Sequence, residues 1–161
     1  MSADEEYTAY VTSRTLWLRR VAYLLCQDWN RADDLVQTAV TRLYLQWRRA
    51  SQADSLDAYT RTVLVRVFLS EQRTGWWKRA VVTDAPPDAA RTGPDLALDL
   101  RAALAALAPR QRAAVVLRFY CDMSIEDTAN ALGCTEGTVK SHTSRALTAL
   151  RRSLAMEGNP L

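Results

Sequence analysis

Apolar residues recur at helical spacing through the first half of the chain, and charged residues fall on the opposite faces. This pattern predicts three helices, over residues 4–26, 31–48 and 57–79. We expect Asp57 to cap the third helix, because a short carboxylate side chain can accept a hydrogen bond from a free backbone amide there. The face of the second helix that we expect to pack inward carries apolar residues at fourfold spacing: Leu35, Ala39, Leu43 and Trp47.

The helical pattern stops in residues 80–94, which hold three of the five prolines and one of the five glycines. Such a composition favours a flexible linker. The pattern then resumes and predicts helices over residues 95–107, 110–120, 124–133 and 135–154. We therefore predict an all-α fold in which two small helical domains, residues 1–79 and 95–161, are joined by a flexible linker over 80–94.

The composition limits the classes of function. The chain has 161 residues, of which 48% are hydrophobic and 24% charged, so it can form a globular core. A net charge of +3 is compatible with nucleic-acid binding without requiring it. Three scattered cysteines and one histidine offer neither a disulfide framework nor a zinc site, so we expect no metal.

Enzymatic activity and membrane insertion are both disfavoured. The chain has no phosphate-binding glycine loop and no paired carboxylates that would share a pocket, so we expect no catalytic residues and no cofactor. No stretch approaches the ~18 apolar residues that span a membrane, and the first residues lack a signal-peptide pattern. We expect a cytoplasmic protein.

Residues 124–150, SIEDTANALGCTEGTVKSHTSRALTAL, have the order of a helix-turn-helix. Ser124 and Asp127 resemble a capping box, Gly133 suits the left-handed residue that ends a helix, and Thr135 suits the cap of the next helix. In such a unit the second helix lies in the DNA major groove. The side chains that we expect to face DNA are Thr138, Lys140, Ser141, Ser144 and Arg145.

Two alternatives to this interpretation stay open at the level of the motif. A helical hairpin with a solvated polar face would have a similar pattern, with Val139, Ala146 and Leu150 facing inward. The run LGCTEGTVKSH also looks like the output domain of LuxR-type activators, which would make the chain a stand-alone DNA-binding regulator. Only the first half of the chain can distinguish between the classes of regulator that share this motif.

Residues 31–47, RADDLVQTAVTRLYLQW, resemble the core-binding helix of bacterial RNA polymerase sigma factors, in which a D-L-V-Q-like run is typical. Residues 105–151 resemble the upstream-element-binding domain of the same family. The resemblance covers about residues 4–154, and it is strongest to the extracytoplasmic-function (ECF) type, in its actinobacterial SigE-type subgroup. It implies a sigma factor that binds core RNA polymerase, directs initiation at promoters with −10 and −35 elements, and is not an enzyme.

The resemblance also implies where each partner binds. The second helix would bind the clamp of the largest polymerase subunit. The flap of the second subunit would be a further partner of the chain. An acidic-and-amide patch suits such a basic helical partner, and the residues concerned are Asp33, Asp34, Gln37 and Thr41. The third helix and the loop over 48–56 would hold the opened −10 strand, because rings stack on bases while cations contact phosphates. The residues expected there are Tyr59, Arg61, Arg66 and Arg73.

Four further points accompany the resemblance. Trp76 and Trp77 belong to the same aromatic and cationic run, although core packing explains at least one of them equally well. Relatives often carry an amide at the position of Arg66. An anti-sigma factor is a further partner that the family allows. A helical interaction module with no role on DNA is the alternative from another class of protein.

Overall fold

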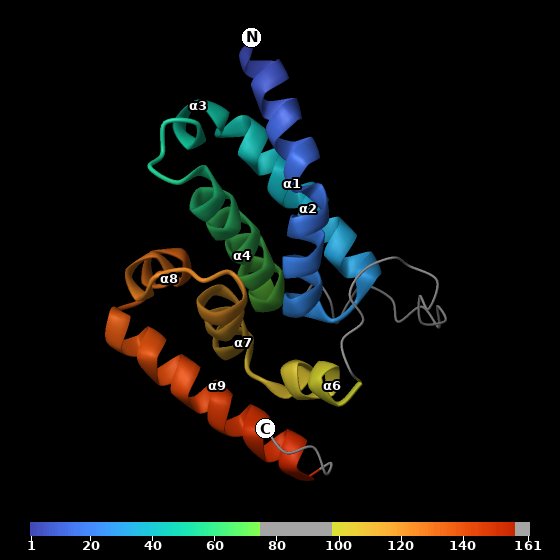
Figure 1. Ribbon diagram of the computed structural model, residues 1–161, viewed down its shortest axis with the longest axis vertical. Coiled ribbons are helices and arrows are strands. Elements are labelled where there is room, and N and C mark those ends of the chain that lie inside the picture. Colours follow the sequence, from blue (N-terminus) through green and yellow to red (C-terminus); the bar gives the residue numbers. More distant parts are fainter. Residues whose placement is uncertain (75–97, 157–161) are drawn as a thin grey trace.

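The computed structural model describes residues 1–74 and 98–156. The predicted linker, Trp76 and Trp77 lie outside these residues. The described part of the first half contains four helices: α1 (Ala3–Cys26), α2 (Trp29–Leu45), α3 (Trp47–Ala50) and α4 (Leu56–Thr74). The described part of the second half contains α6 (Leu98–Ala106), α7 (Pro109–Val115), the π-helical turn η1 (Val116–Tyr120), α8 (Ile125–Leu132) and α9 (Glu136–Met156) (Figure 1). The all-α prediction is confirmed.

The corner between α1 and α2 is closed by hydrogen bonds between neighbouring residues. Gln27 has a left-handed backbone conformation, with φ of 56°, and its amide donates to the Tyr23 carbonyl at 2.7 Å. The Asp28 carboxylate then accepts hydrogen bonds from the amides of Asn30 and Arg31 at 2.8 and 3.1 Å. Because this cap satisfies the first free amides, α2 begins at residue 29 and not at the predicted 31.

The predicted cap of α4 is wrong. The side chain that accepts a hydrogen bond from the first turn belongs to Ser55, whose hydroxyl lies 3.1 Å from the Ala58 amide. Asp57 lies within the first turn, and its carboxylate accepts hydrogen bonds from Tyr10 and Arg14 of α1 instead. Its role is to join two helices, which a rule based on neighbouring residues cannot anticipate.

The predicted helix over 110–120 consists of two parts, an α-helix followed by a π-helical turn. Pro109 occupies the first turn of α7, where its missing amide costs nothing. After Val115 the chain widens into η1, and the Cys121 amide donates to the Val116 carbonyl at 3.0 Å. The π-helical turn leaves Phe119 58% exposed, whereas Cys121 and Met123 return to the core.

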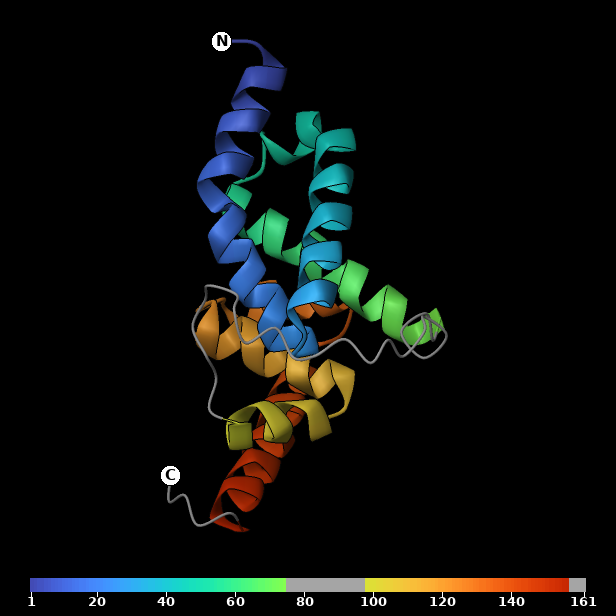
Figure 2. The ribbon, with the colours of Figure 1, turned by 90° about the vertical axis from the view of Figure 1, so that its right-hand side faces the viewer.

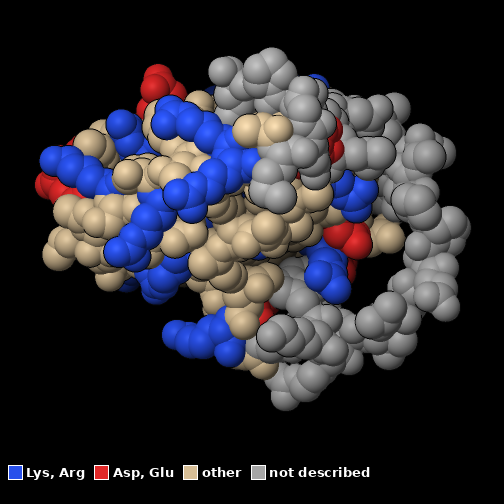
Figure 3. Space-filling view, turned by 90° about the horizontal axis from the view of Figure 1, so that it is seen from below, with Lys and Arg blue, Asp and Glu red and all other residues tan. Residues whose placement is uncertain are grey.

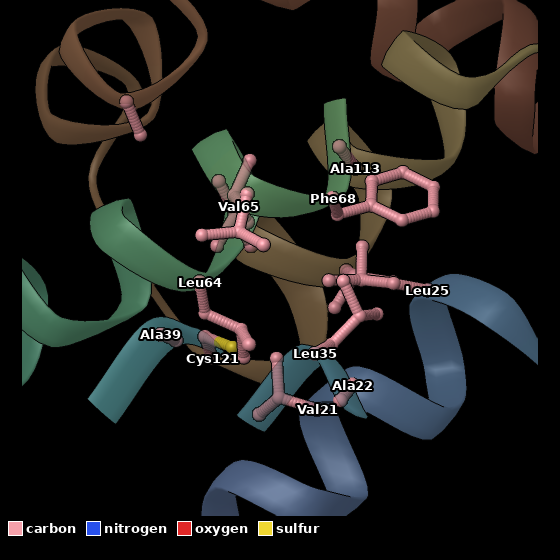
Figure 4. Close-up of a cluster of buried hydrophobic side chains, with 14 of the residues drawn as sticks. Val21, Ala22, Leu25, Leu35, Ala39, Leu64, Val65, Phe68, Ala113 and Cys121 are labelled. Carbon is pink, nitrogen blue, oxygen red and sulfur yellow. The ribbon is translucent and has the colours of Figure 1, made fainter. Parts of the chain in front are cut away.

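The two halves pack on each other through one continuous set of buried side chains. Leu25, Leu35 and Phe68 from the first half belong to the same cluster as Ala113 and Cys121 from the second, and Figure 4 shows these side chains pointing toward one another. In Figure 1 the helices of the first half lie above α6–α9, and Figure 2 shows α9 extending away at the end opposite the start of α1.

Arginines that donate to helix-end carbonyls join the halves a second time. The Arg112 side chain of α7 is buried, and its guanidinium donates to the Leu25 carbonyl of α1 at 2.6 Å. The same guanidinium donates to three carbonyls at the end of α6 and just after it, those of Leu104, Ala105 and Leu107. Arg101 of α6 donates to the Gln27 carbonyl at 3.1 Å. Arginine side chains therefore satisfy carbonyls at the ends of α1 and α6.

We predict that Arg112→Met destabilises the protein by about 3 kcal/mol in urea unfolding, because four carbonyls lose their donor in a buried place. Methionine fills a similar volume, so lost packing contributes little. The control is Arg101→Met, which removes one hydrogen bond at a partly exposed site and should cost about 1 kcal/mol or less. Equal losses for the two variants would contradict the proposed role of the Arg112 guanidinium.

Candidate nucleic-acid and polymerase interfaces

The helix-turn-helix has the three local signals that the sequence predicts. The Ser124 hydroxyl accepts a hydrogen bond from the Asp127 amide at 2.9 Å and caps α8. Gly133 ends α8 with φ of 67°, a conformation that residues with a Cβ adopt at a cost. The Thr135 hydroxyl accepts from the Thr138 amide at 3.1 Å and caps α9. The start of α9 is thereby fixed relative to α8.

The outer face of α9 carries most of the residues predicted to contact DNA. Lys140, Ser141, Ser144 and Arg145 are exposed, while Val139 and Ala146 on the opposite face are fully buried. Thr138 differs from the expectation, because it is partly buried and its hydroxyl lies 2.9 Å from that of Thr135. The view from below shows Lys and Arg side chains gathered on the side of the molecule where α9 lies (Figure 3).

The predicted polymerase-binding residues lie on one face of α2. Asp34, Gln37 and Thr41 are exposed and follow one another at spacings of three and four residues, so they form a row along the helix. The Asp33 carboxylate accepts a hydrogen bond from the Arg19 Nε at 2.6 Å. Although the buried core is continuous across both halves, this row lies outside it.

The predicted −10 residues do not form one free surface on α4. The Arg61 guanidinium lies over the Trp17 ring, 4.3 Å from its centroid. The Arg66 guanidinium donates to the Asn130 and Ala131 carbonyls at the end of α8, at 2.8 and 3.3 Å. Arg73 is exposed near the end of α4. Two of the three cations therefore have intramolecular contacts in this arrangement.

The remaining predicted residue of this group, Tyr59, lies beside a hollow at the start of α4. Its hydroxyl donates to Gln46 Oε1 at 2.8 Å. Gln46 also lines a surface cavity of about 640 Å³, together with Leu45, Arg48, Arg49 and Gln52. Arg48, Arg49 and Gln52 belong to the segment over 48–56 that the sequence predicts to hold the opened −10 strand.

A hydrogen-bonded group of three side chains fixes the start of α4 against α1. Asp57 accepts hydrogen bonds from the Tyr10 hydroxyl at 2.6 Å and from the Arg14 Nε at 2.9 Å. The hydrogen bond from Arg14 lowers the pKa of the Asp57 carboxyl, although partial burial opposes it. Burial and the hydrogen bond to Asp57 raise the pKa of Tyr10 to about 12. The position of Tyr59, two residues further along α4, depends on this contact.

The sequence interpretation missed the arginines that hold the site together. Arg110 Nη1 donates to the Leu132 carbonyl at 2.7 Å, so the end of α8 receives donors from both α7 and α4. Arg112 joins α7 to α1. The only signal in the sequence is that α1 and α8 have no basic residue in their last turns, which leaves their carbonyls to be satisfied from elsewhere.

Comparison with known proteins identifies the family. Residues 11–78 match the family model for Sigma-70 region 2, and residues 97–150 match the model for Sigma-70, region 4. The RNA polymerase sigma-E factor of Streptomyces coelicolor is 40% identical over 158 residues, which cover 92% of this chain and 86% of that protein. The ECF RNA polymerase sigma factor EcfG of Rhodopseudomonas palustris is 34% identical over 88% of this chain and 81% of its own length.

A solved structure has the same architecture. The sigma factor RpoE of Bartonella quintana, solved in complex with the anti-sigma factor NepR, superposes with a TM-score of 0.77 and 27% sequence identity, covering 94% of this chain and 98% of that one. The chain therefore belongs to the sigma-70 family of RNA polymerase sigma factors, of the ECF type. Members of the family are transcription initiation factors and not enzymes. Within residues 1–74 and 98–156, no helix is long and apolar enough to cross a membrane.

We predict that the contact between Asp57 and Arg14 makes stability depend on acid pH. Since the carboxyl pKa is lower in the folded state, the contribution is complete above the ordinary value near 4 and is lost as the pH falls through the folded value. The stability difference between the unsubstituted protein and Asp57→Asn, measured by urea unfolding, should therefore shrink between about pH 6 and about pH 3. The exposed Asp54→Asn is the matched control. A difference that is independent of pH would contradict the prediction.

Proposed function

We propose that the chain binds core RNA polymerase through the exposed row on α2 and directs it to promoters whose −35 element is read by α9. The start of α4 and the loop before it then hold the opened −10 strand. The observation that carries this proposal is the presence of two separate polar surfaces, on α2 and on α9, on one chain of the sigma-70 family. A stand-alone DNA-binding regulator does not bind core polymerase, so it would not need the surface on α2.

The row on α2 suits a protein partner because the fold does not use it. Asp34 and Gln37 are exposed, and the core below them is already filled by Leu35 and Ala39. One carboxylate and one amide side by side can accept hydrogen bonds from a basic helix, such as the clamp of the largest polymerase subunit, and fix its register. Charge on the rim of such an interface acts mainly on the rate of association.

The exposed face of α9 suits duplex DNA. Ser141 and Ser144 are short, so the helix backbone can approach the base edges closely, and Lys140 and Arg145 on the same face can donate to guanine or to phosphate. The capped start of α9 adds free amides directed at the DNA backbone. The separation of this face from the −10 surface then selects promoters by their spacing.

The cavity before α4 suits a single unpaired base. Arg48 and Arg49 at its wall can pair with phosphates, while Gln46 and Gln52 offer amides to a base edge. Arg66 can join this interface only by exchanging its contacts with the Asn130 and Ala131 carbonyls for DNA. Engagement of the −10 strand would therefore loosen the contact between α4 and α8.

The proposed location in the cell and the proposed regulator follow from the partners. Core polymerase is a cytoplasmic enzyme, so we infer a cytoplasmic protein. Because the related Bartonella quintana factor is described in a complex with an anti-sigma factor, we also propose an anti-sigma factor as a regulator of this chain.

The deciding experiment is run-off transcription with core polymerase from the same organism on genomic fragments. Specific starts should appear only with the added chain, and their absence would reject the function.

We predict that Asp34→Arg abolishes binding to core polymerase while the fold survives, because Asp34 is exposed and the new cation faces a basic partner. Binding is measured by co-purification with the core enzyme, and the fold by circular dichroism. The matched control is Glu6→Arg, the same charge change at an exposed position of α1. Retained binding by Asp34→Arg would place the docking surface elsewhere.

We predict that Lys140→Ala reduces run-off initiation about tenfold at promoters that need a −35 element, because one contact to a base edge or phosphate is lost. Arg152→Ala removes the same charge from an exposed position near the end of α9 and should have a much smaller effect. Unchanged output from Lys140→Ala, and also from Arg145→Ala, would favour a protein-interaction module without a role on DNA.

A further inference from the structure

A cavity of about 860 Å³ lies between α4 and the second half of the chain. Its volume is in the range of small-molecule sites, and both halves form its walls. Residues of α2 and α4 make one side, including Arg42 and Arg73, while residues of α7, α8 and α9 make the other, including Arg110 and His142. A ligand in this cavity would contact both halves at once.

The side chains around the cavity are strongly cationic. Four arginines line it, namely Arg42, Arg66, Arg73 and Arg110, and no Asp or Glu is among its lining residues. Glu71 interacts electrostatically with Arg42 but does not line the cavity. Four cationic side chains around one cavity favour an anionic ligand.

Two of the guanidiniums are already held in position. Arg66 donates to the Asn130 and Ala131 carbonyls, and Arg110 donates to the Leu132 carbonyl. Each guanidinium has five N–H donors in a rigid fork, so both keep donors for a ligand after these contacts. Arg42 and Arg73 are exposed and have no hydrogen-bond or ion-pair partner within residues 1–74 and 98–156. Side chains that are fixed beforehand lose less entropy on binding.

The pKa of the histidine at the cavity wall is affected by the neighbouring positive charges. Burial lowers the pKa of His142, and the charges of Arg110 and Arg145 lower it further. Its Nδ1 is buried and has no hydrogen-bond partner among the described residues. An acceptor or donor from a ligand would satisfy this atom.

Apolar residues also line the cavity. Leu69, Ala108 and Pro109 are accessible and are called the apolar floor here, whereas the neighbouring Ala131 and Leu132 are buried. Inorganic phosphate alone would leave this surface in contact with water. A ligand with a planar or apolar part would cover it and gain free energy from the burial.

We propose that this cavity is a regulatory site for a small phosphate-bearing ligand with a planar apolar part, of the class of nucleoside di- and triphosphates. The phosphates bind between Arg42, Arg73 and the held guanidiniums, and the base lies on the apolar floor. Because the ligand contacts both halves, it stabilises their packed arrangement and covers Arg66 and Arg73. The regulatory consequence rests on the proposed function, since the sequence predicts these two residues to contact the −10 strand, whereas the binding itself does not.

The binding test uses isothermal titration of the full chain at 150 mM salt. Guanosine triphosphate, inorganic pyrophosphate and guanosine are the probes. We expect saturable one-to-one binding of the nucleotide, with pyrophosphate and guanosine each at least about tenfold weaker. Arg42→Ala should weaken nucleotide binding about tenfold, because it removes one charge-assisted contact. Arg152→Ala, which removes an exposed charge remote from the cavity, should change it less than about twofold.

Three outcomes would overturn the proposal. The first is the absence of saturable nucleotide binding, and the second is an equal loss for Arg42→Ala and Arg152→Ala, which would indicate general attraction between charges. The third is that a single-stranded oligonucleotide binds in an Arg42-dependent manner while the mononucleotide does not, which would assign the cavity to promoter phosphates. Run-off transcription with and without nucleotide then tests the regulation separately. A chain that binds nucleotide but never initiates would reject the proposed function and keep the site.

Discussion

Hydrogen bonds from arginines to helix-end carbonyls are the constraint on which the rest of this structure depends. The last turns of α1 and α8 have no basic residue, and the backbone amides of Gln27 and Gly133 satisfy part of their carbonyls. Arg112 and Arg66 reach these ends from the opposite half of the chain. These hydrogen bonds hold the halves together along with the shared apolar cluster.

The cross-half contacts of Arg112 and Arg66 differ in how easily they can be exchanged. Arg112 is buried with four carbonyl partners, so it cannot leave without exposing all of them. Arg66 is exposed and contacts two carbonyls, which water could satisfy in its place. The hydrogen bonds of Arg66 are thus the easier to exchange, and they come from the helix whose start we propose for the −10 strand.

The sequence predicted the features that depend on neighbouring residues. The Ser124 and Thr135 caps and the Gly133 turn are short-range patterns, and each is confirmed. The assignment of Asp57 as a cap was wrong because a partner from another helix outweighed the local rule. The hydrogen bonds of Arg66 were not predicted either, since its acceptors lie 64 and 65 residues away. No periodicity encodes a contact between a side chain and the backbone at such a separation, and the binding roles of these residues stay predictions.

The way in which cations are used explains why a modest net charge suffices for a DNA-binding protein. Arg112, Arg66 and Arg110 satisfy carbonyls, and Arg61 lies over Trp17, so much of the positive charge in α4 and α7 serves the fold. The charge of Lys140 and Arg145 on α9 stays exposed. A weak overall field combined with a local cationic face limits non-specific attraction to DNA. Specific binding then depends on both DNA contacts being made together on the polymerase, as the proposed function requires.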